Sequence, residues 1–292
     1  MRIAVLGPVC RDVVSIDGIR SADQLGGIPY YVALTLRNLG VDEVVPYITY
    51  GKADRDWVLG YFDGMNVRSI PVERSLESTL EYTSADPDSR RHKISYSPNV
   101  IEPTTELLAE LERYDHIILS PLFHDDIPYE LFSKLRHKSL IHGNFGMFTY
   151  EEDGKFVRKH PENLIRILPF LTYLFLDDNE AKFVSGASGI DEAGALFLSH
   201  DLKISAITEG SRGSRIFSGK RKYDIPAFPP KALADPTGAG DTYMAAYIRS
   251  LELFETEQER GTFAAMVATM SLEKHGAFDG SLSEVMARLE AE

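Results

Sequence analysis

The fold of this chain is decided by residues 234–247, which read Ala-Asp-Pro-Thr-Gly-Ala-Gly-Asp-Thr-Tyr-Met-Ala-Ala-Tyr. The small residues Gly238, Ala239 and Gly240 stand directly before a pattern that predicts a long helix over residues 239–250. Such a turn lets backbone N–H groups approach an anion closely, and the helix N-terminus adds a partial positive charge. The stretch therefore predicts a phosphate site that also stabilises the charge developing during phosphoryl transfer.

Asp241 is the chemically distinctive residue of this stretch. A carboxylate in the first turn of a helix often does no more than interact favourably with the helix dipole. Beside a phosphate-binding turn, however, a carboxylate repels phosphate unless it has another task. Accepting the proton of an attacking hydroxyl is such a task. We therefore predict that Asp241 is the catalytic base of a phosphoryl transfer.

Composition restricts the class of protein around this motif. The 292 residues carry 31 Lys+Arg against 44 Asp+Glu, a formal net charge of −13, which argues against broad affinity for nucleic acid or anionic membranes. The single cysteine, Cys10, excludes an intrachain disulfide and a cysteine-based zinc cluster. The longest apolar stretch, Ile167–Leu176, is too short to span a membrane. We expect a cytoplasmic protein that binds small molecules.

Strand and helix patterns alternate along the chain. Short apolar runs such as Ile3–Gly7 predict buried strands, and apolar residues at helical spacing, as in Tyr30–Leu39, predict helices. The alternation predicts a mostly parallel sheet covered by helices on both faces. Ligands are then expected at the loops that follow the carboxyl ends of the strands.

Two stretches, residues 13–23 and 78–97, interrupt this alternation. Both look like antiparallel strands joined by turns, and Asp86–Ser89 predicts one of those turns. No repeat, low-complexity tract or linker separates either stretch from the rest of the chain. We therefore predict a single domain over residues 1–292 with a small β-flap, or lid.

Residues 235–241 resemble the C-terminal signature of the PfkB carbohydrate kinases, which have the ribokinase-like fold. Seven specified residues in a row, with Ala245-Ala246 behind them, make this a specific match. The resemblance extends along nearly the whole chain, through further matching segments: Gly7 with Asp12, Leu25-Gly26-Gly27, and Thr208-Glu209-Gly210 with Gly213.

The resemblance implies a fold and an activity. The fold is an α/β three-layer sandwich, in which helices flank a mostly parallel central sheet and a small β-flap forms a lid. The activity is ATP-dependent transfer of the γ-phosphate to a hydroxyl of a small sugar or polyol. In that scheme Asp241 is the base, and the amides of Gly238, Ala239 and Gly240 hold the γ-phosphate.

The same resemblance implies roles for the remaining site residues. Acceptor binding is implied for Asp12, Gly26, Gly27 and Tyr31. Nucleotide binding is implied for Thr208, Gly210, Gly213 and His275. Mg²⁺ is expected near Asp177 and Glu180, held through water, and K⁺ near Asp235.

Two positions depart from the family pattern. Tyr31 stands where the family has an Asn that contacts sugar hydroxyls, and a phenol cannot donate and accept in two directions as a carboxamide does. Tyr31 therefore either lines the acceptor site or only packs. Asp177 replaces the Asn of an Asn-x-x-Glu motif near the magnesium–phosphate site. It is either a carboxylate for a hard cation or an ordinary helix-start residue.

Within the family, the chain most resembles the bacterial and plant myo-inositol kinases. It shares with them Gly7, Asp12-Val13 and Asp17-Gly18, and it resembles them in the flap segments 78–82 and 86–90 and in Ser120-Pro121-Leu122 after a strand. It departs from them at His142–Gly146, where the subgroup tends to read Asp-x-Gln-Gly-Phe. Myo-inositol is therefore the leading expected acceptor. The alternatives are a nucleoside kinase and a non-catalytic small-molecule-binding homologue, and the chain is expected to be a monomer or a homodimer.

Overall fold

The computed structural model describes residues 1–20, 23–83, 86–143 and 146–292. Among these residues the central sheet has nine strands, in the order β16-β15-β14-β13-β10-β9-β1-β5-β6. Neighbouring strands from β14 to β6 are parallel, whereas β15 and β16 are antiparallel to their neighbours. The bounds are β1 Arg2–Pro8, β5 Glu43–Gly51, β6 Arg68–Val72, β9 His116–Leu119, β10 Ser139–Gly143, β13 Tyr173–Asp177, β14 Ile204–Thr208, β15 Ser214–Ser218 and β16 Arg221–Ile225.

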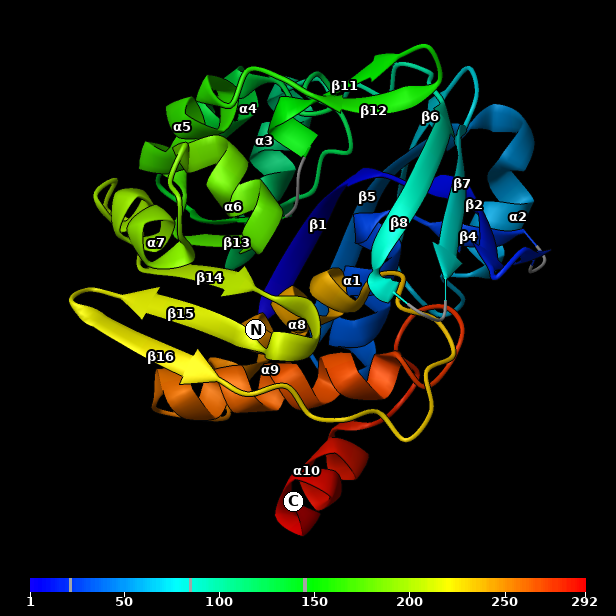
Figure 1. The fold of residues 1–292 in the computed structure, drawn as a ribbon. Helices are drawn as coiled ribbons and strands as arrows, with labels where there is room; N and C mark the ends of the chain where they lie inside the picture. Colours follow the sequence, from blue (N-terminus) through cyan, green and yellow to red (C-terminus); the bar gives the residue numbers. More distant parts are fainter. Residues whose placement is uncertain (21–22, 84–85, 144–145) are drawn as a thin grey trace.

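Helices cover both faces of this sheet, as expected (Figure 1). One face carries α1 (Ile28–Asn38), α8 (Ala239–Ser250) and α9 (Glu257–Ser271), which pack against one another. The opposite face carries α3 (Thr105–Leu111), α4 (Tyr129–Lys134), α5 (Glu162–Ile167), α6 (Asp178–Ser185) and α7 (Ile190–Leu198). Two further helices are α2 (Arg55–Gly60) and the C-terminal α10 (Leu282–Ala291).

The central strands are buried because both of their faces are covered. Residues Ile3–Leu6 of β1 have no exposed surface, which explains why this strand is continuously apolar instead of alternating. The mostly parallel sheet and the flanking helices confirm the predicted α/β class. Across the described residues, no helix combines the length and the apolarity needed to cross a membrane.

A second sheet forms the lid and lies beside one end of the central sheet (Figure 1). Its strand order is β11-β12-β8-β7-β2-β3, and β4 pairs with β2. The bounds are β2 Cys10–Ile16, β3 Ile19–Arg20, β4 Gln24–Gly26, β7 Leu76–Thr83, β8 Asp86–Ser95, β11 Thr149–Glu152 and β12 Lys155–Arg158. The two predicted flap stretches contribute to this sheet, although residues 21–22 and 84–85 lie outside the described residues.

One detail of the predicted lid was wrong, and one hairpin was missed. The predicted turn at Asp86–Ser89 lies within β8, where pairing with β7, through Thr83 opposite Asp86, overrides the local turn preference. Within each stretch the strands are antiparallel as predicted, β2 with β3 and β7 with β8, and the two stretches are joined by the parallel pair β2–β7. The hairpin β11–β12 was not expected at all, and it extends the lid through β8. That the whole chain, residues 1–292, forms a single domain stays a prediction.

Candidate active site

Helix α8 begins at the glycine-rich turn. Its N-cap residue, Gly238, has φ 75° and ψ 6°, a left-handed conformation that glycine adopts without strain. A Cβ atom at this position would lie 2.3 Å from Cδ1 of Tyr31, so a larger residue does not fit. The Asp235 carboxylate accepts a 2.9 Å hydrogen bond from the Thr237 N–H and so closes the turn. The backbone amides in the first turn of α8 therefore lie at a helix N-terminus that these contacts fix in place, and anion binding is favourable at such a position.

A cavity of about 60 Å³ lies beside this turn and collects side chains from distant parts of the chain. Its polar side chains include Asp12 from β2, Tyr31 from α1, Ser78 from β7 and Asp241 from α8. Its apolar wall consists of Leu80 from β7, Ile94 from β8, Leu122 from the loop after β9, and Phe156 from β12. The cavity therefore lies between the turn at the start of α8 and the second sheet.

The structure brings the predicted acceptor residues to this cavity. Asp12, Gly27 and Tyr31 line it together with Asp241. Gly26 packs against Asp12 so closely that a Cβ at position 26 would lie 1.8 Å from the Asp12 Oδ2. These contacts explain why two consecutive glycines precede α1. They do not test which ligand binds there.

Asp12 and Cys10 form a buried hydrogen-bonded pair in the cavity. The Cys10 thiol donates to the Asp12 Oδ1 over 3.0 Å. Burial, followed by the negative charges of Asp12 and Asp241, raises the pKa of the Cys10 thiol well above its ordinary value. The thiol therefore stays protonated at neutral pH and acts as a donor that helps to hold the Asp12 carboxylate.

The predicted magnesium residues lie together at the start of α6. The Asp177 Oδ1 accepts from the Glu180 N–H over 2.7 Å, and the Glu180 Oε2 accepts from the Asp177 N–H over 2.9 Å. This capping box gives both carboxylates a structural task. Within the described residues, no cluster of three or more His, Cys, Asp and Glu side chains forms a metal site. Mg²⁺ would fit here only with water and donor phosphates as its other ligands, which is its usual preference.

Asp235, the predicted potassium residue, is 2% exposed. Besides Thr237, its carboxylate faces the Gln24 Nε2 at 3.4 Å and the His275 Nδ1 at 3.6 Å. Asp235 therefore holds the turn before α8 in place with or without K⁺. The same contact places His275, a predicted nucleotide residue, next to this turn.

The other predicted nucleotide residues share one loop between β14 and β15. Thr208 ends β14 opposite Ser214, and Gly210 begins the short turn that follows. Gly213 has φ 98°, and a Cβ there would lie 2.1 Å from the carbonyl oxygen of Ile225. Gly213 is thus required by the close approach to β16, whatever else the loop binds.

The apolar wall of the cavity escaped the sequence analysis. Phe156 stacks on Phe123, with ring centroids 5.1 Å apart, and so joins the β11–β12 hairpin to the loop after β9. Leu122 belongs to the segment Ser120-Pro121-Leu122 that resembles the inositol kinase subgroup, but no motif marks Phe156, because its place in the cavity depends on strand pairing between distant segments. Leu80 and Ile94 fall in the predicted flap, and their apolar character was the available signal.

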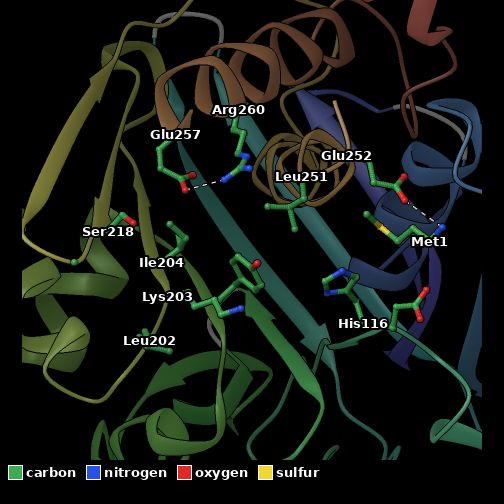
Figure 2. A pocket seen from close by; sticks show the side chains of 13 residues that line it. Met1, His116, Leu202, Lys203, Ile204, Ser218, Leu251, Glu252, Glu257 and Arg260 are labelled. Atoms are coloured by element: carbon green, nitrogen blue, oxygen red, sulfur yellow. Dashed lines mark hydrogen bonds and ion pairs between the residues drawn. The ribbon is translucent and has the colours of Figure 1, made fainter. Parts of the chain in front are cut away.

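A larger cavity, of about 830 Å³, lies at the opposite edge of the central sheet (Figure 2). Met1, His116, Tyr173 and Ile204, at the amino ends of four parallel strands, contribute to its lining. Its charges pair internally, as in Glu257–Arg260 at 2.8 Å and the Met1 amine–Glu252 at 3.2 Å (Figure 2). Ligands of open parallel sheets bind at the carboxyl edge, so size alone does not make this cavity the active site.

Asp126 shapes the loop that supplies Leu122. Its Oδ2 accepts hydrogen bonds of 2.8 Å from the N–H groups of Leu122 and Phe123, and the residue is fully buried. Burial raises the pKa of the Asp126 carboxyl to about 8, and the two N–H donors only partly oppose this shift. The folded chain therefore holds a proton on Asp126 that the unfolded chain, with a pKa near 3.8, releases at lower pH.

We expect Asp126 to make the protein less stable as the pH rises from about 4 to 8, because unfolding releases its proton in that interval. The contribution reaches at most about 1.4 kcal/mol per pH unit. Asp126→Asn keeps a carbonyl acceptor for both N–H groups and removes the titration. The free energy of unfolding in urea should therefore be higher for the variant than for the wild type, by a difference that grows between pH 5 and pH 8. The exposed control Asp63→Asn should follow the wild type, and parallel curves for Asp126→Asn would contradict the prediction.

The three-layer α/β fold, with a glycine turn at the start of α8 and a lid over the adjoining cavity, defines the ribokinase-like class. The sequence profile of the pfkB family carbohydrate kinases matches residues 61–284, which is more than half of the chain. The chain therefore belongs to the PfkB family of carbohydrate kinases.

Two curated relatives match part of the chain. Ribokinase of Bacillus subtilis is 35% identical over 109 residues, which cover 37% of this chain and 36% of the relative. Nucleoside kinase of Methanocaldococcus jannaschii is 29% identical over 119 residues, which cover 39% of this chain and 37% of the relative. The aligned segments thus span little more than a third of each relative.

Solved structures match nearly the whole chain. A pyrophosphate-dependent kinase in the ribokinase family, complexed with a pyrophosphate analogue and myo-inositol, has a TM-score of 0.79 and 23% identity, covering 98% of this chain and 99% of its own. A putative ribokinase II from E. coli, in complex with ATP and Mg²⁺, has a TM-score of 0.79 and 17% identity, covering 100% and 99%. At these identities the likeness shows the fold alone.

Proposed function

We propose that this protein is a kinase that transfers the γ-phosphate of ATP to a hydroxyl of a small uncharged polyol, with myo-inositol as the leading acceptor. One observation carries the proposal. Two carboxylates, Asp12 and Asp241, share one cavity with the N-terminal turn of α8. A carboxylate beside an anion-binding turn is the arrangement that a phosphoryl transfer to a hydroxyl requires.

Each group of site residues has a separate role in the proposed phosphoryl transfer. The Asp241 carboxylate accepts the proton of the acceptor hydroxyl as its oxygen bonds to the γ-phosphorus, and the bond from phosphorus to the β–γ bridging oxygen breaks. The amides of Gly238, Ala239 and Gly240 stabilise the charge on the transferred group. Asp12, Gly26, Gly27 and Tyr31 hold the acceptor. Mg²⁺, held through water by Asp177 and Glu180, supplies further neutralisation of the phosphates.

The donor and ion assignments complete the proposal. Thr208, Gly210, Gly213 and His275 bind the nucleotide, and K⁺ binds near Asp235. The E. coli structure with ATP and Mg²⁺ supports this donor, whereas the pyrophosphate-dependent structure makes inorganic pyrophosphate a donor worth testing. We further propose that the enzyme acts in the cytoplasm, as a monomer or a homodimer.

The lining of the cavity supports an uncharged acceptor. Asp12 and Asp241 are its acidic side chains, and no lysine or arginine contributes to its described lining. A phosphorylated sugar would meet uncompensated negative charge there. The cavity is small, at about 60 Å³, which favours a compact acceptor over a nucleoside. The relative named nucleoside kinase keeps that class as the second candidate.

The proposal is tested by product formation across a panel of donors and acceptors. Inositols, pentoses, hexoses, sugar phosphates and nucleosides are each assayed with Mg-ATP or Mg-pyrophosphate, and with K⁺ or Na⁺. We expect one strong uncharged polyol acceptor, whose turnover is abolished by EDTA. A nucleoside as the preferred acceptor would replace the polyol assignment. Donor binding with no transfer to any acceptor would favour a non-catalytic binding protein.

A further inference from the structure

The larger cavity, of about 830 Å³, is separate from the candidate active site. Helix α8 has 12 residues, so its two ends are about 18 Å apart. Its N-cap Gly238 and its first-turn residue Asp241 line the small cavity, whereas Leu251, directly after its last residue, lines the large one. The volume of the large cavity lies within the range of about 300–1,000 Å³ that is usual for small-molecule sites. A ligand there would therefore occupy a second site, at the amino ends of the central strands.

Tyr173 supplies a buried polar side chain to the lining of this cavity. The residue is 7% exposed, and its hydroxyl makes no hydrogen bond to any described residue. The hydroxyl oxygen itself keeps accessible surface, so a group from outside the chain can reach it. Burial raises the pKa of Tyr173, so the hydroxyl keeps its proton and can donate. Because most buried tyrosine hydroxyls are paired, this one marks a position that favours a hydrogen-bond acceptor in the cavity.

His116 forms the neighbouring part of the wall (Figure 2). Its ring lies edge-on to Tyr173, with ring centroids 6.4 Å apart. Its Nδ1 lies 2.8 Å from the Ser139 Oγ, and its Nε2 makes no hydrogen bond to a described residue. Burial lowers the pKa of His116, so the ring is uncharged at neutral pH. The two rings therefore offer aromatic surface with uncharged polar groups. The apolar part of the lining includes Leu202, Ile204 and Leu251.

The charged side chains of the lining are paired, with one exception. The pairs are Glu257 with Arg260 at 2.8 Å, the Met1 amine with Glu252 at 3.2 Å, and Asp115 with Arg2 at 3.3 Å. Lys203 is the exception, because no carboxylate of the described residues forms an ion pair with its ammonium group. The lining therefore carries one uncompensated positive charge, which favours a ligand with a single negative charge.

We propose that the large cavity binds a small organic monocarboxylate, whose carboxylate pairs with Lys203 and which accepts a hydrogen bond from the Tyr173 hydroxyl. The two groups start from adjacent positions, since Tyr173 lies opposite Ile204 in the β13–β14 pair and Lys203 directly precedes Ile204. The apolar body of the ligand packs against the aromatic and apolar lining. A phosphate dianion is disfavoured, because its second charge would lie beside the carboxylates of the lining. The inference does not depend on the proposed kinase function.

The test is the binding of benzoate to the full-length chain, measured by calorimetry or ligand-detected NMR. Benzamide is the uncharged analogue, and phenyl phosphate is the dianionic one. We expect benzoate to bind the wild type more tightly than either analogue. Lys203→Met should weaken benzoate binding about tenfold and remove its advantage over benzamide. Tyr173→Phe should weaken it about fivefold and leave the melting temperature of the ligand-free protein unchanged, because the lost hydroxyl has no partner in the fold.

Lys52→Met is the matched control. Lys52 is also exposed and also forms no ion pair with a described residue, but it lies outside the cavity lining. This variant should bind benzoate as the wild type does. The affinity for benzoate should also stay the same when Mg-ATP is present, because the two sites lie at opposite edges of the central sheet.

Four outcomes would overturn the inference. No binding of benzoate at millimolar concentration would mean that the cavity holds only water. Equal affinity in the wild type and Lys203→Met would place the probe elsewhere, and displacement by Mg-ATP would place it in the candidate active site. Tighter binding of phenyl phosphate than of benzoate, lost in Lys203→Met, would replace the carboxylate by a phosphate.

Discussion

Asp241→Asn is expected to lower kcat by about 10²–10⁴-fold, because a carboxamide cannot take the proton of the acceptor hydroxyl. Asp241 lies in the first turn of α8 and lines the cavity with Asp12. The substitution preserves size and leaves Gly238 in its left-handed conformation, so fold and donor binding should persist. Donor affinity should even increase slightly, because a negative charge beside the phosphate-binding turn is removed.

Single-turnover phosphoryl transfer and donor binding, measured side by side, check this expectation. The control is Asp56→Asn, since Asp56 also lies in the first turn of a helix, α2, but its side chain is 96% exposed. If an acidic side chain in the first turn of a helix acted only through the helix dipole, both variants would lose a little stability and neither would lose activity. Near-normal turnover by Asp241→Asn would remove Asp241 from the role of base.

Gly238→Ala is expected to lower kcat by about 10²-fold or more, because it displaces the amides that face the transferred phosphoryl group. An alanine at φ 75° is strained by about 1–2 kcal/mol, and its Cβ would overlap the Tyr31 ring at 2.3 Å. Either the turn or the ring must move. Both belong to the proposed site, so acceptor KM should rise together with the loss in kcat.

The control variant Gly64→Ala separates the effect of backbone strain from the effect of the Cβ overlap with Tyr31. Gly64 also has φ 75°, but a Cβ there meets no atom within 4 Å. This control should share the backbone strain and lose comparable stability, seen as a lower melting temperature, while its kcat and acceptor KM stay normal. Equal activity in Gly238→Ala and Gly64→Ala would show that the geometry of the turn does not matter for transfer.

The α/β class and the turn before α8 could be predicted because both are encoded locally. A continuous apolar run such as Ile3–Leu6 reports burial on both faces of a strand. The small residues Gly238–Gly240 before a helical pattern predict a turn and the start of a helix, and α8 begins there at Ala239. Likewise Ser281 with Glu284 predicts a capping box at the start of the last helix, and the structure has one there.

The lid shows where local patterns fail. Asp86–Ser89 favours a turn by composition, yet it continues a strand, since pairing with β7 contributes more than the local preference. The β11–β12 hairpin reaches the lid only because Lys155 pairs with Lys93, far away in the sequence. Strand pairing of this kind depends on which surfaces meet, and no window of a few residues contains that information.

The carboxylate of Asp241 behind the glycine turn could be proposed as a base from the chain alone, and Asp12 after the first strand was implied by the family resemblance. Their meeting in one cavity, the apolar wall of Leu122 and Phe156, and the packing of the Tyr31 ring against Gly238 were decided by the tertiary structure. Burial and hydrogen-bond partners depend on segments distant in sequence, so whether Tyr31 packs or binds could be argued only from the folded chain.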